Sequence, residues 1–372
     1  MHNPAPRAQV SIDLDAIRHN VALLAARAPT AALMAVVKAD GYGHGAIPVA
    51  RAALQGGATA LGVASAAEAL VLRTAGIGAP LLCWLDLPGT DHRPVLQADV
   101  EVGISDLDSL LALAADARQL GVRARVHLKV DTGLNRNGCP AALWPQLVRR
   151  AAELPDIDVR AIFSHLACAD EPGHRSIDAQ AHRFELAHQQ ALEAGLRPAR
   201  HLANSAATLT RPDLHFDVVR TGIAIYGCNP VPQQEDLRPA MTFRSAVALV
   251  KRVAAGESVS YGHTWTAPRE CTLALVPVGY ADGVPRGLSG RLRVSLGGAQ
   301  RHVVGRVCMD QLVVDCGDTT VSPGDPVVLF GRADRGEPTA RNWADTLGTI
   351  DYEIVTGMYR PRVERVYVGA GQ

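Results

Sequence analysis

The chain has 372 residues, 48% of them hydrophobic and 20% charged, which gives enough apolar side chains for a large folded core. Its 37 basic and 37 acidic side chains balance, whereas proteins that bind nucleic acid or membrane surfaces usually carry a basic excess. No apolar run reaches the roughly 20 residues that a membrane-spanning helix needs. Residues 1–6 lack the basic and apolar parts of a secretory signal, and the seven cysteines include no C-x-x-C pair, so we expect a cytoplasmic protein.

Between residues 30 and 222, short apolar runs alternate with Ala- and Leu-rich helical stretches. Eight units of this kind over about 200 residues predict a parallel (β/α)8 barrel of the TIM type. An open doubly wound sheet is the alternative, but no G-x-G-x-x-G motif follows the first strand. The predicted strands are Leu33–Lys38, Ala60–Ser65, Pro80–Leu85, Val100–Ser105, Arg125–Asp131, Val159–His165, Arg200–Asn204 and Phe216–Thr221. The predicted helices are Leu14–Ala28, Ala46–Gln55, Asp106–Leu120, Ala141–Glu153 and Ser176–Ala194.

The pattern changes after Pro239, where alternating apolar and polar segments are separated by Gly, Pro and Asp. This alternating pattern predicts a mostly antiparallel β domain after the barrel. The proline-rich stretch Asn229–Pro239 is the expected boundary, so we assign residues 10–235 to the barrel and 236–372 to the β domain. Its predicted strands are Phe243–Val250, Cys271–Gly279, Arg291–Leu296, Val303–Val307, Gln311–Asp315, Pro326–Phe330 and Glu364–Val368, with a helix at Thr339–Leu347.

Lysine is scarce in this chain. Only Lys38, Lys129 and Lys251 stand among the 37 basic residues. Lys251 lies beside an arginine and fits a solvated surface charge, whereas Lys38 and Lys129 each end an apolar stretch. Because an amine forms Schiff bases and carbamates and a guanidinium does not, these two lysines are candidate chemical groups.

Polar residues gather where the predicted barrel strands end, which is where barrels of this type carry their chemistry. Each cluster alone has an ordinary structural explanation, such as a surface amine, a core histidine or a helix cap. Five clusters on one barrel face favour a functional site, although a metal-dependent hydrolase built on His127 and His165 is an alternative. The clusters are Lys38 with the Gly-rich turn 39–45, Lys129 with Asp131 and Arg136, His165, Asn204 with Ser205, and Arg220 with Thr221 and Gly222.

The segment Ala35–Gly45, with Lys38 at its centre, resembles the pyridoxal phosphate lysine signature of alanine racemases. Further segments of that family follow in the same order along nearly the whole chain. In the barrel they are Leu128–Arg136, Phe163–His165, Asn204–Ala206 and Val219–Ile223, and in the β domain Ser260–Gly262, Val278–Gly283, Gly305–Gln311 and Asp351–Glu353.

The resemblance implies that pyridoxal 5'-phosphate is the cofactor and that Lys38 holds it covalently, then acts as a base when substrate takes its place. It also implies that Arg220 faces the pyridine nitrogen. Because a guanidinium cannot accept a proton, that nitrogen stays unprotonated, which favours racemisation over transamination. The other implied cofactor contacts are Tyr42, Arg136, Asn204, Ser205, Gly222, Ile223 and Tyr352.

The resemblance implies a substrate pocket with Arg136, Met309 and Tyr280 as contacts. Lys129, often carbamylated in the family, would position Arg136 beside the cofactor's phenolic oxygen. A salt bridge between Lys129 and Asp131 or another neighbour is the alternative. Met309, together with Tyr261 and Tyr352, is expected to crowd the substrate's β-carbon and so favour alanine.

Inverting an α-carbon requires one acid or base on each face. The resemblance implies that Tyr261 serves the face opposite Lys38, with His165, held near Arg220, as the positive neighbour that favours phenolate. In the family this tyrosine, with the equivalents of Met309 and Asp310, comes from the partner subunit. We therefore expect a homodimer with shared active sites.

The implied activity is interconversion of L- and D-alanine, supplying D-alanine for bacterial cell-wall peptidoglycan; a catabolic role is equally compatible. No metal, nucleic acid or membrane partner is expected. Three alternatives share the architecture in whole or part: a broad-specificity or serine racemase, a decarboxylase, and a non-catalytic pyridoxal phosphate carrier. A decarboxylase is expected to carry a Cys-Asp-Gly-like motif at Val307–Gln311, and carriers resemble the barrel alone.

Overall fold

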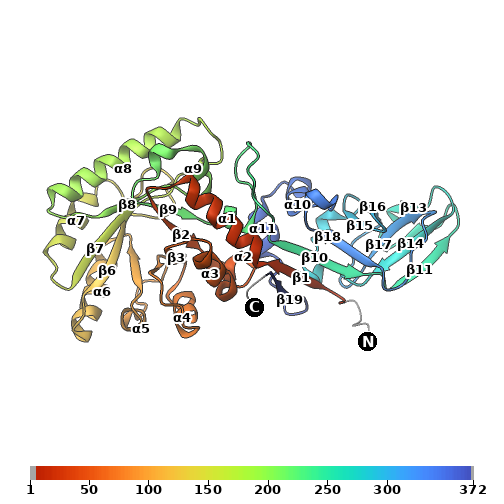
Figure 1. Cartoon of the computed structure of the whole chain (residues 1–372), viewed down its shortest axis with the longest axis horizontal. Helices are drawn as coiled ribbons and strands as arrows, with labels where there is room; N and C mark the ends of the chain where they lie inside the picture. The colour runs from red at the N-terminus through yellow and green to blue at the C-terminus, as the bar shows by residue number, and fades with distance from the viewer. Residues whose placement is uncertain (1–5, 370–372) are drawn as a thin grey trace. The chain divides into compact units, whose positions relative to one another are not determined.

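The computed structural model describes residues 6–369, so most of the segment searched for a secretory signal lies outside the described residues. The chain divides into two compact units (Figure 1). The barrel unit is Ile17–Leu237. The β unit combines the residues up to Ala16 with those from Arg238 onward.

The barrel unit is built on eight parallel strands in the order β8-β7-β6-β5-β4-β3-β2-β9. Backbone hydrogen bonds from Asp217 N to Arg200 O (3.2 Å) and from Arg220 N to Ala203 O (2.9 Å) join the ends of this sheet. The predicted eight-stranded barrel is therefore confirmed. Its strands are β2 (Ala32–Val36), β3 (Ala60–Val63), β4 (Leu81–Cys83), β5 (Glu101–Ile104), β6 (Ala124–Lys129), β7 (Ile157–Phe163), β8 (Ala199–His201) and β9 (Val218–Thr221).

The barrel helices begin and end where the sequence supplies caps. At the start of α4, Ser65 Oγ accepts from Glu68 N while the Glu68 carboxylate accepts from Ser65 N, which forms a capping box. Helix α6 starts after Asp106, which accepts from Ser109 N, and ends at Gly121 in the left-handed conformation. The helices are α1 (Leu14–Arg27), α3 (Ala46–Gln55), α4 (Ala66–Thr74), α5 (Arg93–Gln97), α6 (Leu107–Leu120), α7 (Trp144–Glu153), α8 (Ser176–Glu193) and α9 (Ser205–Thr210), with 3-10 turns η1 (Pro212–Leu214) and η2 (Ile223–Tyr226).

The β unit contains a nine-stranded sheet in the order β11-β14-β17-β16-β15-β18-β10-β1-β19. All its strand pairs are antiparallel except β1 with β19, which confirms the predicted mostly antiparallel domain. Its strands are β1 (Gln9–Asp13), β10 (Met241–Ala246), β11 (Leu249–Val253), β14 (Cys271–Val276), β15 (Arg293–Leu296), β16 (Ala299–Val304), β17 (Leu312–Gly317), β18 (Pro326–Phe330) and β19 (Glu364–Val368). A small sheet pairs β12 (Ser258–Val259) with β13 (Trp265–Thr266), and the helices are α10 (Ala340–Leu347) and α11 (Asp351–Thr356), with 3-10 turns η3 (Tyr261–His263), η4 (Tyr280–Asp282), η5 (Arg286–Leu288) and η6 (Ala333–Arg335).

The unit boundaries differ from the predicted ones at both ends of the barrel. Strand β1 pairs with β10 and β19, and its Val10 and Ile12 are buried, so the barrel unit starts at Ile17 rather than at residue 10. The other boundary follows Leu237 rather than residue 235. The single strand expected at 243–250 is two strands, because β10 pairs with β18 whereas β11 pairs with β14.

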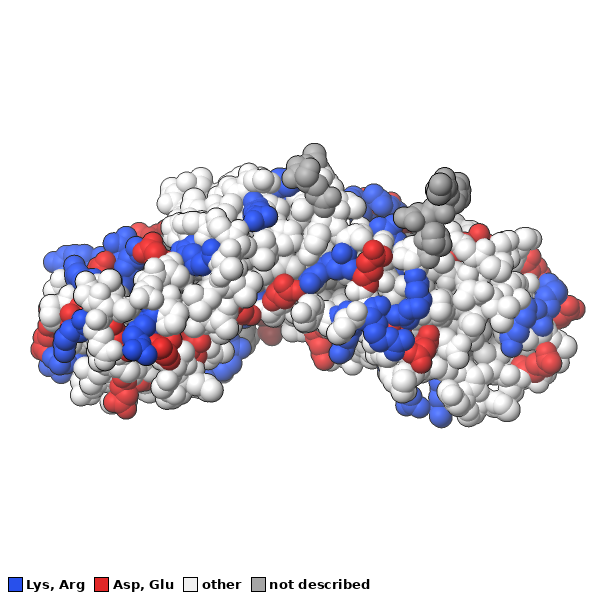
Figure 2. Space-filling model, turned by 90° about the horizontal axis from the view of Figure 1, so that it is seen from below, with Lys and Arg blue, Asp and Glu red and all other residues white. Residues whose placement is uncertain are grey.

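The surface charges, the helices and the cysteines can be compared with what the composition predicts. On the face drawn in Figure 2, basic and acidic side chains are interspersed. Among residues 6–369, no helix has both the length and the apolar character needed to cross a membrane. All seven cysteines are free thiols.

Candidate active site

Lys38 opens an unusual left-handed turn, α2 (Lys38–Tyr42), after β2. The φ angles of Ala39, Asp40 and Tyr42 are 53°, 51° and 52°, and Gly41 between them has 62°. Each non-glycine residue in this conformation costs about 1–2 kcal/mol, so the surroundings must hold the turn in place. Backbone strain of this kind often accompanies a functional position.

Two carboxylates hold this turn. Glu68 Oε1 accepts a hydrogen bond from Ala39 N at 2.8 Å, while Glu68 also caps α4. Asp40 Oδ1 accepts from Ala46 N at 2.9 Å and so ties the turn to α3. Sequence reasoning did not assign Glu68 to the site, although its Ser-x-x-Glu capping pattern was visible in the sequence.

The residues predicted to hold a phosphate adjoin one another. Gly222 N donates to Ser205 Oγ at 2.8 Å, and Ala224 N donates to the same oxygen at 3.3 Å. A Cβ on residue 222 would lie 2.5 Å from Tyr42 Oη, so only glycine fits beside this phenol. Ile223 follows directly at the start of η2.

Asn204 serves as the N-cap of α9, and its Oδ1 accepts a hydrogen bond from Ala207 N at 3.1 Å. This cap fixes the entry to the helix that carries Ser205. The structure therefore gives Asn204 a clear local partner, and its predicted cofactor contact stays a prediction.

Arg220, on β9, is buried and held by several neutral acceptors. Its Nη1 donates to His201 O at 2.7 Å and to His201 Nδ1 at 3.2 Å. Its Nη2 donates to Ser164 O at 2.7 Å, with Leu202 O and His165 Nδ1 both at 3.4 Å. Burial lowers the pKa of Arg220 to about 10, which leaves the guanidinium charged at neutral pH.

The aromatic ring of Phe163 contacts two of the cations in the site, Arg220 and Lys129. The Arg220 guanidinium carbon lies 5.5 Å from the ring centroid, and Lys129 Nζ lies 5.4 Å from it. These contacts are within cation–π range. Lys38 Nζ has a similar position 5.9 Å from the Tyr42 ring.

Four positive charges influence one another at this end of the barrel: Lys38, Lys129, Arg136 and Arg220. Burial lowers the pKa of Lys129 to about 8, and the charges of Arg220, Arg136 and Lys38 act in the same direction. Burial also lowers the pKa of Lys38, with help from Arg136 and Arg220. Such a cluster favours an anionic ligand such as a phosphate ester.

His165 lies within the same cluster, and its surroundings oppose a positive charge on it. Burial and the charges of Arg220, Arg136, Lys129 and Lys38 lower its pKa to about 3. The imidazole is therefore neutral at pH 7 in this arrangement. The expected role of His165 as the positive neighbour of Tyr261 stays a prediction, which these surroundings disfavour, whereas Arg220 keeps its charge.

Lys129 does not form the salt bridge considered as its alternative role. In the described part of the chain, no carboxylate oxygen lies within 4.0 Å of its amine. Asp131 Oδ1 instead accepts from Gly133 N at 2.9 Å and Asn135 N at 3.2 Å. Its carboxylate thus stabilises the loop that carries Arg136.

The remaining predicted residues belong to the β unit and are exposed within it. Tyr261 is 72% exposed, Met309 53%, Tyr280 40% and Tyr352 38%. Tyr352 lies on α11, which the sequence analysis did not predict. The structure thus groups the predicted residues into two sets, one in each unit.

Within the β unit, the Tyr280 and Met309 segments lie side by side. Tyr280 N donates to Cys308 O and Ala281 N donates to Met309 O, both at 3.0 Å. A Cβ on Gly279 would lie 2.2 Å from Cys308 O, so this close approach requires glycine.

Tyr261 is presented by a strained backbone. The φ of Ser260 is +66° and that of His263 is +46°, and Ser260 Oγ donates to Arg306 O at 2.9 Å. A pocket of about 410 Å³ adjoins the tyrosine. It is lined by Ser260, Tyr261, Gly262, His263, Leu275, Cys308, Gln311 and Val313.

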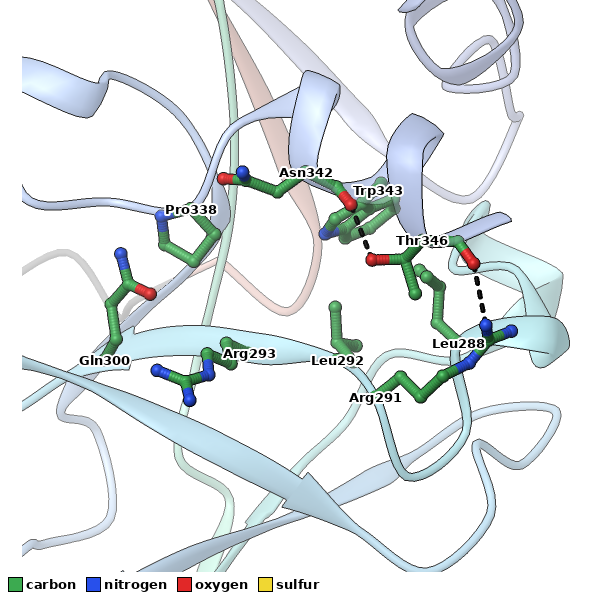
Figure 3. Close-up of a pocket in the computed structure, with 9 residues that line it drawn as sticks. All are labelled: Leu288, Arg291, Leu292, Arg293, Gln300, Pro338, Asn342, Trp343 and Thr346. Atoms are coloured by element: carbon green, nitrogen blue, oxygen red, sulfur yellow. Dashed lines mark hydrogen bonds between the residues drawn. The ribbon is translucent and has the colours of Figure 1, made fainter. Parts of the chain in front are cut away.

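A second pocket of about 320 Å³ in the β unit contains none of the predicted site residues (Figure 3). Arg291 Nη1 donates there to Thr346 O at 2.8 Å, and Thr346 Oγ1 donates to Asn342 O at 2.7 Å. These polar groups thus have partners within the fold, and we do not assign this pocket to the active site.

Among residues 6–369, no group of three or more His, Cys, Asp or Glu side chains is arranged to hold a metal ion, and His127 has other partners. Its ring nitrogens bond to Glu101 Oε2 at 2.7 Å and to His201 Nε2 at 2.8 Å. Sequence reasoning assigned neither Glu101 nor His201, because their proximity depends on how the barrel strands align.

The chain matches two family models, described as "Alanine racemase, N-terminal domain" over residues 12–230 and "Alanine racemase, C-terminal domain" over residues 240–367. The alanine racemase of Mycobacterium avium (strain 104) is 54% identical, covering 98% of this chain and 96% of that protein. That of Thermobifida fusca (strain YX) is 53% identical and covers 98% of each chain. A solved alanine racemase structure from D-cycloserine producing Streptomyces lavendulae has a TM-score of 0.96 at 50% identity, with 99% of each chain covered. These matches confirm the resemblance inferred from the motifs.

Proposed function

This chain belongs to the alanine racemase family and interconverts L- and D-alanine, and we propose that it does so with pyridoxal phosphate and two bases, Lys38 and Tyr261. The general role of this enzyme is to supply D-alanine for bacterial cell-wall peptidoglycan. The observation that carries the proposal is the cationic cluster around Lys38, which adjoins the tight cradle of Ser205, Gly222 and Tyr42.

The barrel residues fit pyridoxal phosphate. Backbone N–H groups and a hydroxyl after the last strands suit a phosphate, and Gly222 lets the Tyr42 phenol approach them where any Cβ would clash with it. We assign the phosphate to Tyr42, Ser205, Gly222, Ile223 and, from α11, Tyr352. When bound, the cofactor supplies an electron sink for the negative charge that develops at the substrate's α-carbon.

Lys38 needs a neutral amine both to attach the cofactor and to accept a proton. Its burial and the nearby Arg136 and Arg220 favour that neutral form. The strained turn after Lys38, fixed by Glu68 and Asp40, supports a defined direction for its side chain.

Arg220 is the proposed partner of the cofactor's ring nitrogen. Both of its terminal nitrogens are occupied by protein acceptors, and its Nε–H makes no hydrogen bond within the described residues. The Nε–H is therefore the donor that we assign to the ring nitrogen.

Tyr261 is proposed as the base for the second face, contributed by the partner subunit of a homodimer. Its high exposure in the β unit supports this assignment, since a residue that serves another chain need not be covered by its own. The positive charge that favours phenolate comes in this proposal from Arg220, with neutral His165 between them as a hydrogen-bonding group.

Arg136, Met309 and Tyr280 are the proposed substrate contacts. The guanidinium of Arg136 suits a carboxylate. A pocket discriminates between two substrates that differ by one or two atoms by only about 1–3 kcal/mol. Slow racemisation of serine is therefore also expected. We place the enzyme in the cytoplasm, which its seven free cysteines support.

The test is the loss of optical rotation of L-alanine on incubation with the protein and pyridoxal phosphate, repeated with L-serine. We expect alanine to be racemised much faster than serine. Binding of the cofactor without racemisation of any amino acid would favour the carrier function, and faster turnover of serine would favour a serine racemase.

A further inference from the structure

The interior of the barrel holds a continuous line of hydrogen-bonded side chains that ends on Arg220. It starts at Glu101, the first residue of β5, whose Oε2 lies 2.7 Å from His127 Nε2 on β6. His127 Nδ1 lies 2.8 Å from His201 Nε2 on β8. His201 Nδ1 lies 3.2 Å from Arg220 Nη1 on β9.

The two ends of this line determine the direction of every bond in it. A guanidinium only donates hydrogen bonds and an ionised carboxylate only accepts them. His201 Nδ1 must therefore accept from Arg220, which leaves His201 Nε2–H to donate to His127 Nδ1. His127 Nε2–H then donates to Glu101. Each link has one donor and one acceptor when both imidazoles are neutral and protonated on Nε2.

The line is shielded from solvent along most of its length. His201 is fully buried, and His127 and Arg220 are 5% and 7% exposed. The Phe163 ring stacks on His201 with a centroid separation of 4.8 Å and an interplanar angle of 3°. Burial holds the pKa of His201 well below its ordinary value, in agreement with a neutral ring.

Arg220 has no direct anionic partner. Its acceptors are the carbonyls of Ser164, His201 and Leu202 and an imidazole nitrogen, and no salt bridge to it occurs among residues 6–369. The line links Arg220 through two imidazoles to the carboxylate of Glu101, whose own ion-pair partner is Arg125. Arg125 Nε also lies 3.3 Å from Glu101 Oε1 and fixes that carboxylate.

We propose that Glu101 is a positioning residue for Arg220, acting through His127 and His201. By fixing both histidines in one tautomer, it presents an acceptor to Arg220 Nη1 and keeps the Nε–H available for the cofactor. The role in catalysis rests on the proposed function, whereas the tautomers are a property of the cofactor-free protein.

Glu101→Gln makes this proposal testable because it keeps the shape and replaces a carboxylate that can only accept by an amide that can accept or donate, so the tautomers are no longer fixed. The amide can donate to His127 Nε2, which reverses both tautomers and places a His201 N–H against an Arg220 N–H. The hydrogen bond between Arg220 and His201 is then lost, and the free-energy cost of burying these two N–H groups is no longer offset.

The matched control is Asp99→Asn. Asp99 lies two residues earlier and pairs with the same Arg125 at 2.6 Å, but it does not belong to the line. Its φ of +58° is one that asparagine tolerates.

The first measurement is NMR of the cofactor-free protein labelled with 15N-histidine, with signals assigned by single histidine substitutions. We expect the native chain and Asp99→Asn to show His127 and His201 protonated on Nε2 only, and Glu101→Gln to lose that pattern. A native chain with His201 protonated on Nδ1 would overturn the proposal without any variant.

The second measurement is kcat/KM for alanine, with pyridoxal phosphate bound to each enzyme. We expect at least a tenfold fall for Glu101→Gln and less than a twofold change for Asp99→Asn. Full activity of Glu101→Gln would refute the positioning role. A native chain with the expected tautomers but no racemase activity would instead contradict the proposed function.

Discussion

Gly222 faces the phenol of Tyr42 so closely that a methyl group on residue 222 would lie 2.5 Å from the phenolic oxygen. Tyr42 is buried and is the last residue of the left-handed turn that begins at Lys38, so it has little freedom to move aside. The cradle proposed for the cofactor phosphate therefore depends on the absence of a side chain at position 222.

Gly222→Ala should weaken the binding of pyridoxal phosphate about tenfold, because overpacking of this kind costs about 1–3 kcal/mol. The dissociation constant is measured by titrating the cofactor-free protein and following its fluorescence. Gly78→Ala is the control, since a Cβ there meets nothing within 4 Å and the affinity should not change. An unchanged affinity of Gly222→Ala would show that the phosphate lies elsewhere.

Lys129→Ala should lose at least a hundredfold in racemisation rate, and acetate should restore part of it. The reason is the proposed carbamate, an anion that forms from a neutral amine and whose role a small carboxylate can take over. Burial and three neighbouring cations lower the Lys129 pKa to about 8, so the neutral amine becomes abundant as the pH rises towards 8. Lys251→Ala, on an exposed lysine, is the control. Full activity of untreated Lys129→Ala would rule the role out.

Tyr261→Phe should lower racemisation by about 10²–10⁴-fold, the usual contribution of a positioned acid or base. Exchange of the α-hydrogen of D-alanine for deuterium should continue, because in the proposed scheme Lys38 acts on the α-proton of D-alanine and Tyr261 on that of L-alanine. Both are followed in deuterated buffer by polarimetry and by NMR. Loss of exchange along with racemisation would mean that Tyr261 does not act on one face alone.

Mixing Tyr261→Phe with Lys38→Ala chains should restore activity if the sites are shared between subunits. Half of the randomly mixed dimers are hybrids, and each hybrid has one intact site of two, so recovery should approach about a quarter of native activity. Each variant alone is the control. Absence of recovery after confirmed subunit exchange would place both bases in the same chain.

His165→Asn should make folding less sensitive to acid. The pKa of His165 is lowered to about 3 by burial and four cations, so the unfolded chain binds more protons than the folded chain below about pH 6.5. Stability of the native chain must therefore fall as the pH drops, and this one group contributes about 2 kcal/mol of that loss between pH 7 and pH 5. Urea unfolding of the cofactor-free proteins measures the difference, with exposed His302→Asn as control. Equal acid sensitivity in all three proteins would contradict a neutral His165.

Sequence patterns predicted the architecture well because, in a barrel, the residues that pack in the core also form regular local patterns along the chain. Each of the eight parallel strands is a short apolar run next to a helix, and the strand ends locate Lys38, His165 and Arg220 on one face. The turn after Lys38 could not be predicted, since alanine, aspartate and tyrosine avoid positive φ unless contacts such as that from Glu68 hold them.

Other features depend on register, which local patterns do not determine. Glu101, His127 and His201 meet because of the registers in which β5, β6, β7 and β8 pair. Helix α11, with Tyr352, has only six residues and is too short to show a helical period. The five-residue strand β1 was overlooked for the same reason, because only its partners reveal it.

The position of β1 also affects how the chain acquires its structure during synthesis. The strand β1 is synthesised before the barrel, yet it lies between β10 and β19, which are both synthesised after the barrel. The barrel can therefore fold while β1 still lacks both neighbours. Removing Gln9–Asp13 should accordingly destabilise the β unit rather than the barrel unit that follows this strand in sequence.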